Sequence, residues 1–160
     1  PPNLVPYLDS GRLLLLRSMT KDHALAGLRL GYAAARPEII DCLVRVRAPW
    51  SVNTAAQAAG LAALQYIEHV ERARHVVGQA RAYLVEQLGR LGLQVVPSAA
   101  NFLMVRVGDG AAFRGALLER GVCVRDCASF GLPAYVRIGV RALPDCRRLV
   151  VAAREVLAGG

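Results

Sequence analysis

A short polar segment near the start of the chain carries an amine and two hydroxyls. Ser18, Thr20 and Lys21 lie within four residues of one another, and Arg29 follows shortly afterwards. A lysine amine can form an imine with an aldehyde, and hydroxyl and guanidinium groups are good donors to a phosphate. Together these residue types predict a site for a phosphorylated aldehyde.

Lys21 stands out because it is the only lysine in the sequence. The chain has 20 basic residues, and the other 19 are arginines. An arginine can replace a lysine in most ion pairs, but a guanidinium that stays protonated cannot act as a nucleophile toward an aldehyde. The position of the one lysine is therefore informative, and it coincides with the polar segment.

Two apolar runs flank this segment. We expect strands at Arg12 to Ser18 and at Leu30 to Ala35, each buried on both faces of a parallel sheet, because their apolar residues are continuous rather than alternating. Lys21 then lies at the carboxyl end of the first strand, the edge at which α/β sheets bind ligands. We expect Gly27 to let the backbone turn back, so that Arg29 faces Lys21.

The remaining pattern predicts helices followed by a mixed layer. Pro37 marks the start of a helix to about Arg45, and a second helix runs from Thr54 to about Glu68. A third, from about Val70 to Leu91, has an apolar stripe at spacings of three and four and is ended by Gly92. Strands are then expected at 94–96, 102–107, 122–124 and 135–140, with helices at 111–119 and 145–157.

The segment from Ser18 to Tyr32 reads Ser-x-Thr-Lys-x-x-x-Leu-Ala-Gly-Leu-Arg-Leu-Gly-Tyr. It resembles the cofactor segment of fold-type-I pyridoxal-phosphate (PLP) enzymes, class I/II aminotransferases, and within that class it most resembles histidinol-phosphate aminotransferases and threonine-phosphate decarboxylases. Residues 48–53, 101–103, 121–133 and 135–141 are similar to later parts of the same enzymes. The resemblance implies an α/β fold in which residues 1–62 are the C-terminal part of the large PLP-binding domain and residues 63–160 form a small α+β domain.

The resemblance also implies roles for individual residues. Lys21 would hold PLP as a Schiff base, Ser18, Thr20 and Arg29 would contact its phosphate, and Arg137 would bind the substrate carboxylate with its planar fork. Arg141 either assists Arg137 or lies on the surface. Trp50 and Tyr32 are expected in the core, with a place beside the substrate as the alternative.

The implied activity is transamination between amino-acid and keto-acid substrates in amino-acid biosynthesis. The substrate is an amino acid, and a phosphorylated one such as histidinol phosphate is an option; decarboxylation of threonine phosphate is the alternative reaction. The resemblance covers the C-terminal half of the family, so we expect the chain alone to be incomplete for catalysis and its parent to be a homodimer. The opening residues have no initiating Met and read as a loop within a longer protein.

Charge and cysteine content address other classes of function. The net charge of +8 favours a basic nucleic-acid-binding module, and a non-catalytic assembly module is a further alternative. However, the arginines are spread along the chain without a basic run or interleaved aromatics, so we expect a solvated surface and no nucleic-acid partner.

The four cysteines form no metal-binding spacing, and we expect no metal and a cytoplasmic location. No apolar run approaches the length of a membrane span, and no secretory signal is expected.

Overall fold

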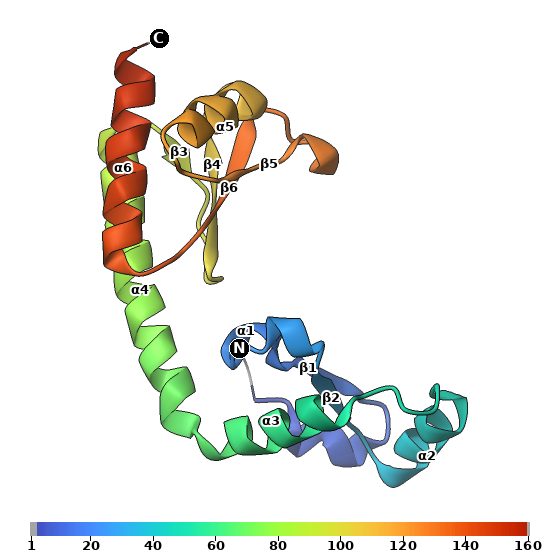
Figure 1. The fold of residues 1–160 in the computed structure, drawn as a ribbon. Coiled ribbons are helices and arrows are strands. Elements are labelled where there is room, and N and C mark those ends of the chain that lie inside the picture. The colour runs from blue at the N-terminus through green and yellow to red at the C-terminus, as the bar shows by residue number, and fades with distance from the viewer. Residues whose placement is uncertain (1–2, 160) are drawn as a thin grey trace. The chain divides into compact units, whose positions relative to one another are not determined.

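The structure is a computed structural model that describes residues 3–159. It comprises two compact units, one ending at Ala73 and the other beginning at Arg74, and their elements are labelled in Figure 1. Both units combine helices with a sheet. The division lies within a long helix, later in the chain than the boundary at residues 62/63, which stays a prediction about the domains of the protein.

The first unit contains two short strands and several helices. Their bounds are η1 (Val5–Ser10), β1 (Leu15–Ser18), α1 (Met19–Asp22), η2 (Ala26–Leu28), β2 (Gly31–Ala34), α2 (Pro37–Val46), α3 (Thr54–Gln65) and the start of α4 (Ile67–Arg90). The expected starts at Pro37 and Thr54 are confirmed. Asn53 caps α3, since its side chain accepts a hydrogen bond from the Ala56 amide at 2.8 Å.

The expectation of a parallel sheet buried on both faces was wrong for the two strands of this unit. β1 and β2 pair antiparallel, with Leu15 opposite Ala34 and Ser18 opposite Gly31. The connection between them turns back through α1 and η2, so it joins neighbouring antiparallel strands rather than forming a parallel crossover. Most residues of both strands are exposed in the described chain, and Leu16 is 69% exposed. An apolar run predicts burial but does not say which segment covers it.

The second unit is an antiparallel sheet with helices packed against it. Its elements are the rest of α4, β3 (Gln94–Val95), β4 (Phe102–Arg106), α5 (Gly110–Glu119), β5 (Arg125–Asp126), η3 (Ala128–Phe130), β6 (Tyr135–Gly139) and α6 (Leu143–Ala158). The strand order is β3-β4-β6-β5. Gly92 follows α4 with a φ of +78°, a conformation that favours glycine and ends the helix as expected. The strand expected at 122–124 was misplaced, because pairing with β6 begins only at Arg125.

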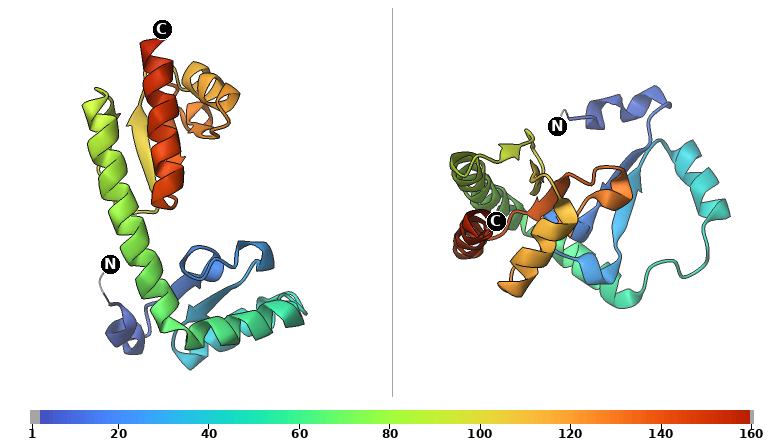
Figure 2. Two further views of the ribbon diagram at one scale, coloured as in Figure 1. Left: turned by 60° about the vertical axis from the view of Figure 1, so that its left-hand side comes forward. Right: turned by 90° about the horizontal axis from the view of Figure 1, so that it is seen from above.

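The core of the second unit lies on one face of this sheet. Leu103 and Val105 of β4 and Val136 and Ile138 of β6 are buried there against α4, α5 and α6. From α4 the core takes Leu84 and Leu88, members of the apolar stripe predicted from the sequence. Figure 2 shows α4 and α6 side by side. Because side chains alternate along a strand, Phe102, Met104 and Arg137 lie on the opposite face of the sheet.

Residues 3–159 lack a membrane-spanning helix and a metal-binding cluster of side chains. None of the helices there combines the length and the apolar character that crossing a membrane requires. Likewise, no three His, Cys, Asp or Glu side chains of this part of the chain come together in a way that would hold a metal ion.

Candidate cofactor and substrate site

Lys21 lies in α1, the single helical turn that follows β1 directly (Figure 1). Its side chain is exposed, and no salt bridge within residues 3–159 involves it. Ser18 is the N-cap of this turn and accepts a hydrogen bond from the Thr20 amide at 3.3 Å. The position expected for the reactive amine, at the end of a strand, is therefore the position in the structure.

The two hydroxyls of the segment lie next to each other. Ser18 Oγ and Thr20 Oγ1 are 2.8 Å apart, within hydrogen-bond distance. Thr20 is 8% exposed whereas Ser18 is exposed, so the inner hydroxyl is fixed by packing and the outer one faces solvent. A hydroxyl can rotate its proton toward an incoming acceptor, so the pair can donate to an anionic oxygen.

Backbone contacts and α3 hold the Lys21 segment in place. The Met19 amide donates to the Leu30 carbonyl at 3.1 Å, and the Leu25 amide donates to the Met19 carbonyl at 3.3 Å. Met19 is 3% exposed and lies against Gly60 of α3, where an added methyl group would collide with the Leu30 side chain. The segment thus rests on a small buried cluster, which fixes the turn that carries Lys21.

The turn that carries Arg29 differs from the expectation. Gly27 is not in a left-handed conformation; instead Ala24 and Arg29 have φ values of +56° and +54°. Non-glycine residues with such φ values are strained by about 1 kcal/mol each and cluster at functional sites. The Arg29 guanidinium donates to the Ala26 carbonyl at 3.3 Å, and η2 packs against α1. No hydrogen bond in the described chain joins Arg29 to Ser18, Thr20 or Lys21.

Arg137 belongs to the second unit. It lies on β6, half-buried, on the face of the sheet that points away from the core, with Met104 of β4 opposite it. Its guanidinium carbon is 5.3 Å from the centre of the Phe102 ring, a cation–π distance. No salt bridge involves Arg137 in the part of the chain that the structure describes.

Arg125 is a candidate site residue that the sequence analysis did not single out. It lies opposite Arg137 rather than pairing with the neighbouring Asp126; its guanidinium is over the Phe130 ring at 5.0 Å and 3.3 Å from Ser129 Oγ. Asp126 instead accepts a hydrogen bond from the Ala128 amide. Two cations directly opposite each other repel, and an anion placed between them relieves this. The juxtaposition depends on strand register, which the sequence does not reveal.

Other candidate residues have different roles. Arg141 donates to Asp145 at 2.8 Å, and that hydrogen bond, with the charge of Asp145, raises the pKa of Arg141. This exposed pair is what the surface option predicts, and the option that Arg141 assists Arg137 stays a prediction. Trp50 is 96% exposed and Tyr32 is 46% exposed, so the expectation that they pack in the core is wrong for this chain.

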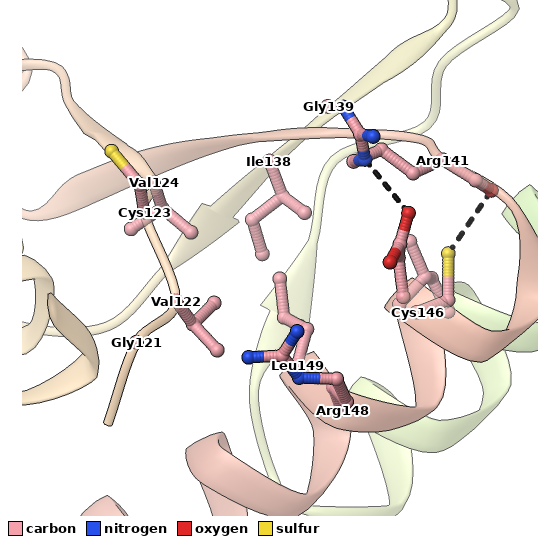
Figure 3. A pocket seen from close by; sticks show the side chains of 12 residues that line it. Gly121, Val122, Cys123, Val124, Ile138, Gly139, Arg141, Cys146, Arg148 and Leu149 are labelled. Carbon is pink, nitrogen blue, oxygen red and sulfur yellow. Dashed lines mark hydrogen bonds and ion pairs between the residues drawn. The ribbon is translucent and has the colours of Figure 1, made fainter.

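A cavity of about 350 Å³ lies in the second unit between residues 121–124 and α6 (Figure 3). None of the five predicted site residues lines it. Cys146 at its wall is buried and donates to the Arg141 carbonyl, and burial raises the pKa of this thiol. Because the folded state favours the protonated thiol, the contribution of Cys146 to the stability of the fold is fully present below the ordinary pKa of a thiol. That contribution is lost as the pH rises through the raised pKa of Cys146. At neutral pH the thiol is protonated and unreactive.

Comparison with known proteins identifies a family. The family model described as aminotransferase class I and II matches residues 1–155. The histidinol-phosphate aminotransferase of Symbiobacterium thermophilum is 46% identical over 153 residues, covering 95% of this chain and 42% of that protein. Histidinol-phosphate aminotransferase 1 of Cupriavidus pinatubonensis is 44% identical over 147 residues, covering 89% and 39%. The chain spans less than half the length of these relatives.

Solved structures show the same fold. The histidinol-phosphate aminotransferase of Clostridium acetobutylicum has a TM-score of 0.89 at 25% identity, covering 99% of this chain and 50% of that one. The histidinol-phosphate aminotransferase of Sinorhizobium meliloti, solved in complex with pyridoxal-5'-phosphate, has a TM-score of 0.80 at 24% identity, covering 94% and 42%. The mixed helix and sheet architecture expected from the sequence is confirmed by this likeness.

Proposed function

Because this chain belongs to the aminotransferase class I and II family, we propose that the protein containing it is a PLP-dependent aminotransferase in which Lys21 binds the cofactor. The observation that carries the proposal is the exposed amine of the only lysine, on a turn whose two hydroxyls are 2.8 Å apart. These donors fit the cofactor, since the amine suits its aldehyde and the hydroxyls, with Arg29, suit its phosphate.

In this proposal, Lys21 transfers the proton, and Ser18, Thr20 and Arg29 bind the cofactor phosphate. The chemistry that PLP would supply when bound is a place for the electron pair of the bond broken at the substrate Cα. The Lys21 amine would serve as the general base that takes the Cα proton and holds it for its return. Ser18, Thr20 and Arg29 hold the phosphate and thereby fix where this proton transfer takes place.

Arg137 orients the substrate in this proposal. Its planar fork can grip a carboxylate or a phosphate through two parallel hydrogen bonds. For an amino acid that anion is the α-carboxylate. For histidinol phosphate, which the names of the curated relatives favour and which lacks a carboxylate, it is the phosphate ester. Arg125, opposite Arg137, supports a substrate with more than one negative charge.

The direct test is an activity assay on the full-length protein with PLP. We expect histidinol phosphate and 2-oxoglutarate to give glutamate, and Lys21→Arg to lower this rate by at least roughly 10³-fold because the charge stays while the nucleophilic amine is lost. Release of carbon dioxide from threonine phosphate, without a keto acid, would instead support the decarboxylase.

A matched double variant shows whether activity requires the amine at position 21 or merely a lysine somewhere in this part of the chain. Lys21→Arg with Arg12→Lys restores the basic composition but moves the amine to an exposed position before β1. We expect it to be as inactive as Lys21→Arg alone, whereas Arg12→Lys alone keeps full activity. Retention of activity in Lys21→Arg would refute the role of Lys21.

A further inference from the structure

Arg137 lies on the sheet face that points away from the core of the second unit. Few neighbouring side chains on this face could hold its guanidinium in place. Met104 and Arg125 lie directly opposite it on the two neighbouring strands. Met104 offers no charge, and Arg125 repels it. Phe102 is its diagonal neighbour on β4, and the residue directly opposite Phe102 is Gly139, which has no side chain to lie over the ring.

The guanidinium of Arg137 makes a cation–π contact with the Phe102 ring. Its central carbon is 5.3 Å from the ring centre, within the range of about 6 Å in which a cation is attracted to the face of an aromatic ring. This contact uses none of the guanidinium N–H groups, and no side-chain hydrogen bond or salt bridge within residues 3–159 involves Arg137. The N–H groups are the ones that grip a carboxylate or phosphate.

Hydrogen bonds fix the main chain at Phe102, which carries the ring. Ser98 Oγ donates to the Phe102 carbonyl at 2.8 Å, and the Val140 amide donates to the Asn101 carbonyl at 2.9 Å, beside the pairing of β4 with β6. A long arginine side chain has many rotamers, and ordering it lowers the entropy of the site when a ligand binds. A ring that orders the guanidinium in advance removes part of that cost.

We propose that Phe102 is a positioning residue, which stacks under the Arg137 guanidinium and holds it ready for the anionic group of the substrate. This inference rests on the substrate-binding role proposed for Arg137. It differs from a packing role because it requires the ring and not merely apolar volume.

The test uses the full-length enzyme with PLP and compares two ring-less variants, Phe102→Leu and Phe102→Met, with Phe102→Tyr. We expect the ring-less variants to raise the KM for glutamate and the inhibition constant of propanoate by roughly three- to tenfold, with little change in kcat. Phe102→Tyr keeps the ring and should leave both constants within about twofold of the original. Met104→Leu, on the same face and opposite Arg137, is the matched control and should change neither constant.

Arg137→Ala separates this inference from the function on which it rests. If Arg137→Ala leaves the propanoate constant unchanged, the proposed role of Arg137 fails. If Arg137→Ala raises that constant but the ring-less variants do not, only the role of Phe102 is overturned. Equal losses in Phe102→Leu and Phe102→Tyr would also overturn it, since they would report packing rather than the ring.

A double variant gives a second readout that does not depend on folding alone. If the ring acts through Arg137, Phe102→Leu should have no further effect on propanoate inhibition in an Arg137→Ala background. An undiminished further effect there would contradict the proposal. Melting temperatures of all variants show whether a change in binding accompanies a change in stability.

Discussion

Lys21 and the two hydroxyls beside it could be located from the sequence because their relation is local. Ser18 and Thr20 are two positions apart, and their 2.8 Å contact arises within one helical turn. Arg125 could not be found in this way, because its position opposite Arg137 depends on the pairing of β5 with β6. The turn at Arg29 was anticipated, but glycine was assigned the conformation that Ala24 and Arg29 adopt. Local spacing therefore predicts which side chains lie together within a single turn, but it does not predict which side chains lie together across paired strands.

Thr20 gives a prediction at the residue scale. Thr20→Val keeps the buried shape but removes the hydroxyl, so we expect PLP to bind the full-length protein roughly 10- to 150-fold more weakly, the loss of one hydrogen bond to a charged group. Equilibrium titration of cofactor fluorescence measures this. Thr20→Ser, which keeps the hydroxyl, is the control and should bind within about threefold of the original protein. Equal affinity of Thr20→Val and the original protein would remove Thr20 from the phosphate site.

At the scale of elements, periodicity predicted the helices well and the strand partners poorly. The starts of α2 and α3 follow from Pro37 and Asn53, and the stripe on α4 supplies Leu84 and Leu88 to the core. A continuous apolar run such as Leu13 to Leu16 carries no signal for the direction of its neighbour, and β1 pairs antiparallel with β2. Strand pairing is decided by the path of the connection, which the apolar pattern does not record.

The β1–β2 pair depends on Gly31. A Cβ atom at this position would lie 2.7 Å from the Arg17 carbonyl oxygen, a backbone atom that cannot move aside without disturbing the pair. We expect Gly31→Ala to lower the free energy of unfolding of the full-length protein by about 1–3 kcal/mol and to weaken PLP binding, because β1 leads directly into the Lys21 turn. Urea unfolding with the cofactor absent measures the first effect.

Gly27→Ala is the matched control for that experiment. A Cβ atom there meets no atom within 4 Å and the backbone is not left-handed, so we expect a change within about 0.5 kcal/mol. A large loss in Gly27→Ala would restore the original view that this glycine forms the turn. A neutral Gly31→Ala would contradict the close approach of β1 and β2.

At the scale of the whole molecule, the two units differ in how much they bury. The second unit has a continuous core drawn from α4, β4, α5, β6 and α6. In the first unit, the buried residues of the described chain are Met19, Thr20, Ala56 and Gly60, while large apolar side chains such as Leu16 and Trp50 are exposed. Hydrophobic burial is the main favourable term in folding, so the units should differ in autonomy. Homodimer formation and a cytoplasmic location stay predictions.

Separate expression of the two units tests this difference. We expect residues 74–160 to unfold cooperatively in urea, monitored by circular dichroism, and residues 1–73 to show no cooperative transition. The shorter piece serves as the comparison for the longer one, because both contain helix and strand. Cooperative unfolding of residues 1–73 alone would show that its small buried cluster is sufficient for folding.

The central claim is that Lys21 carries the cofactor, and reductive labelling tests it most directly. The full-length protein is incubated with PLP, reduced with borohydride, digested and analysed by mass spectrometry. Lys21 is the only lysine of this chain, so a label on a lysine within these residues has a unique position. We predict one phosphopyridoxyl group per chain, on the peptide that contains Lys21 and absent from Lys21→Arg. A label confined to another peptide, or none on the active protein, would contradict the account.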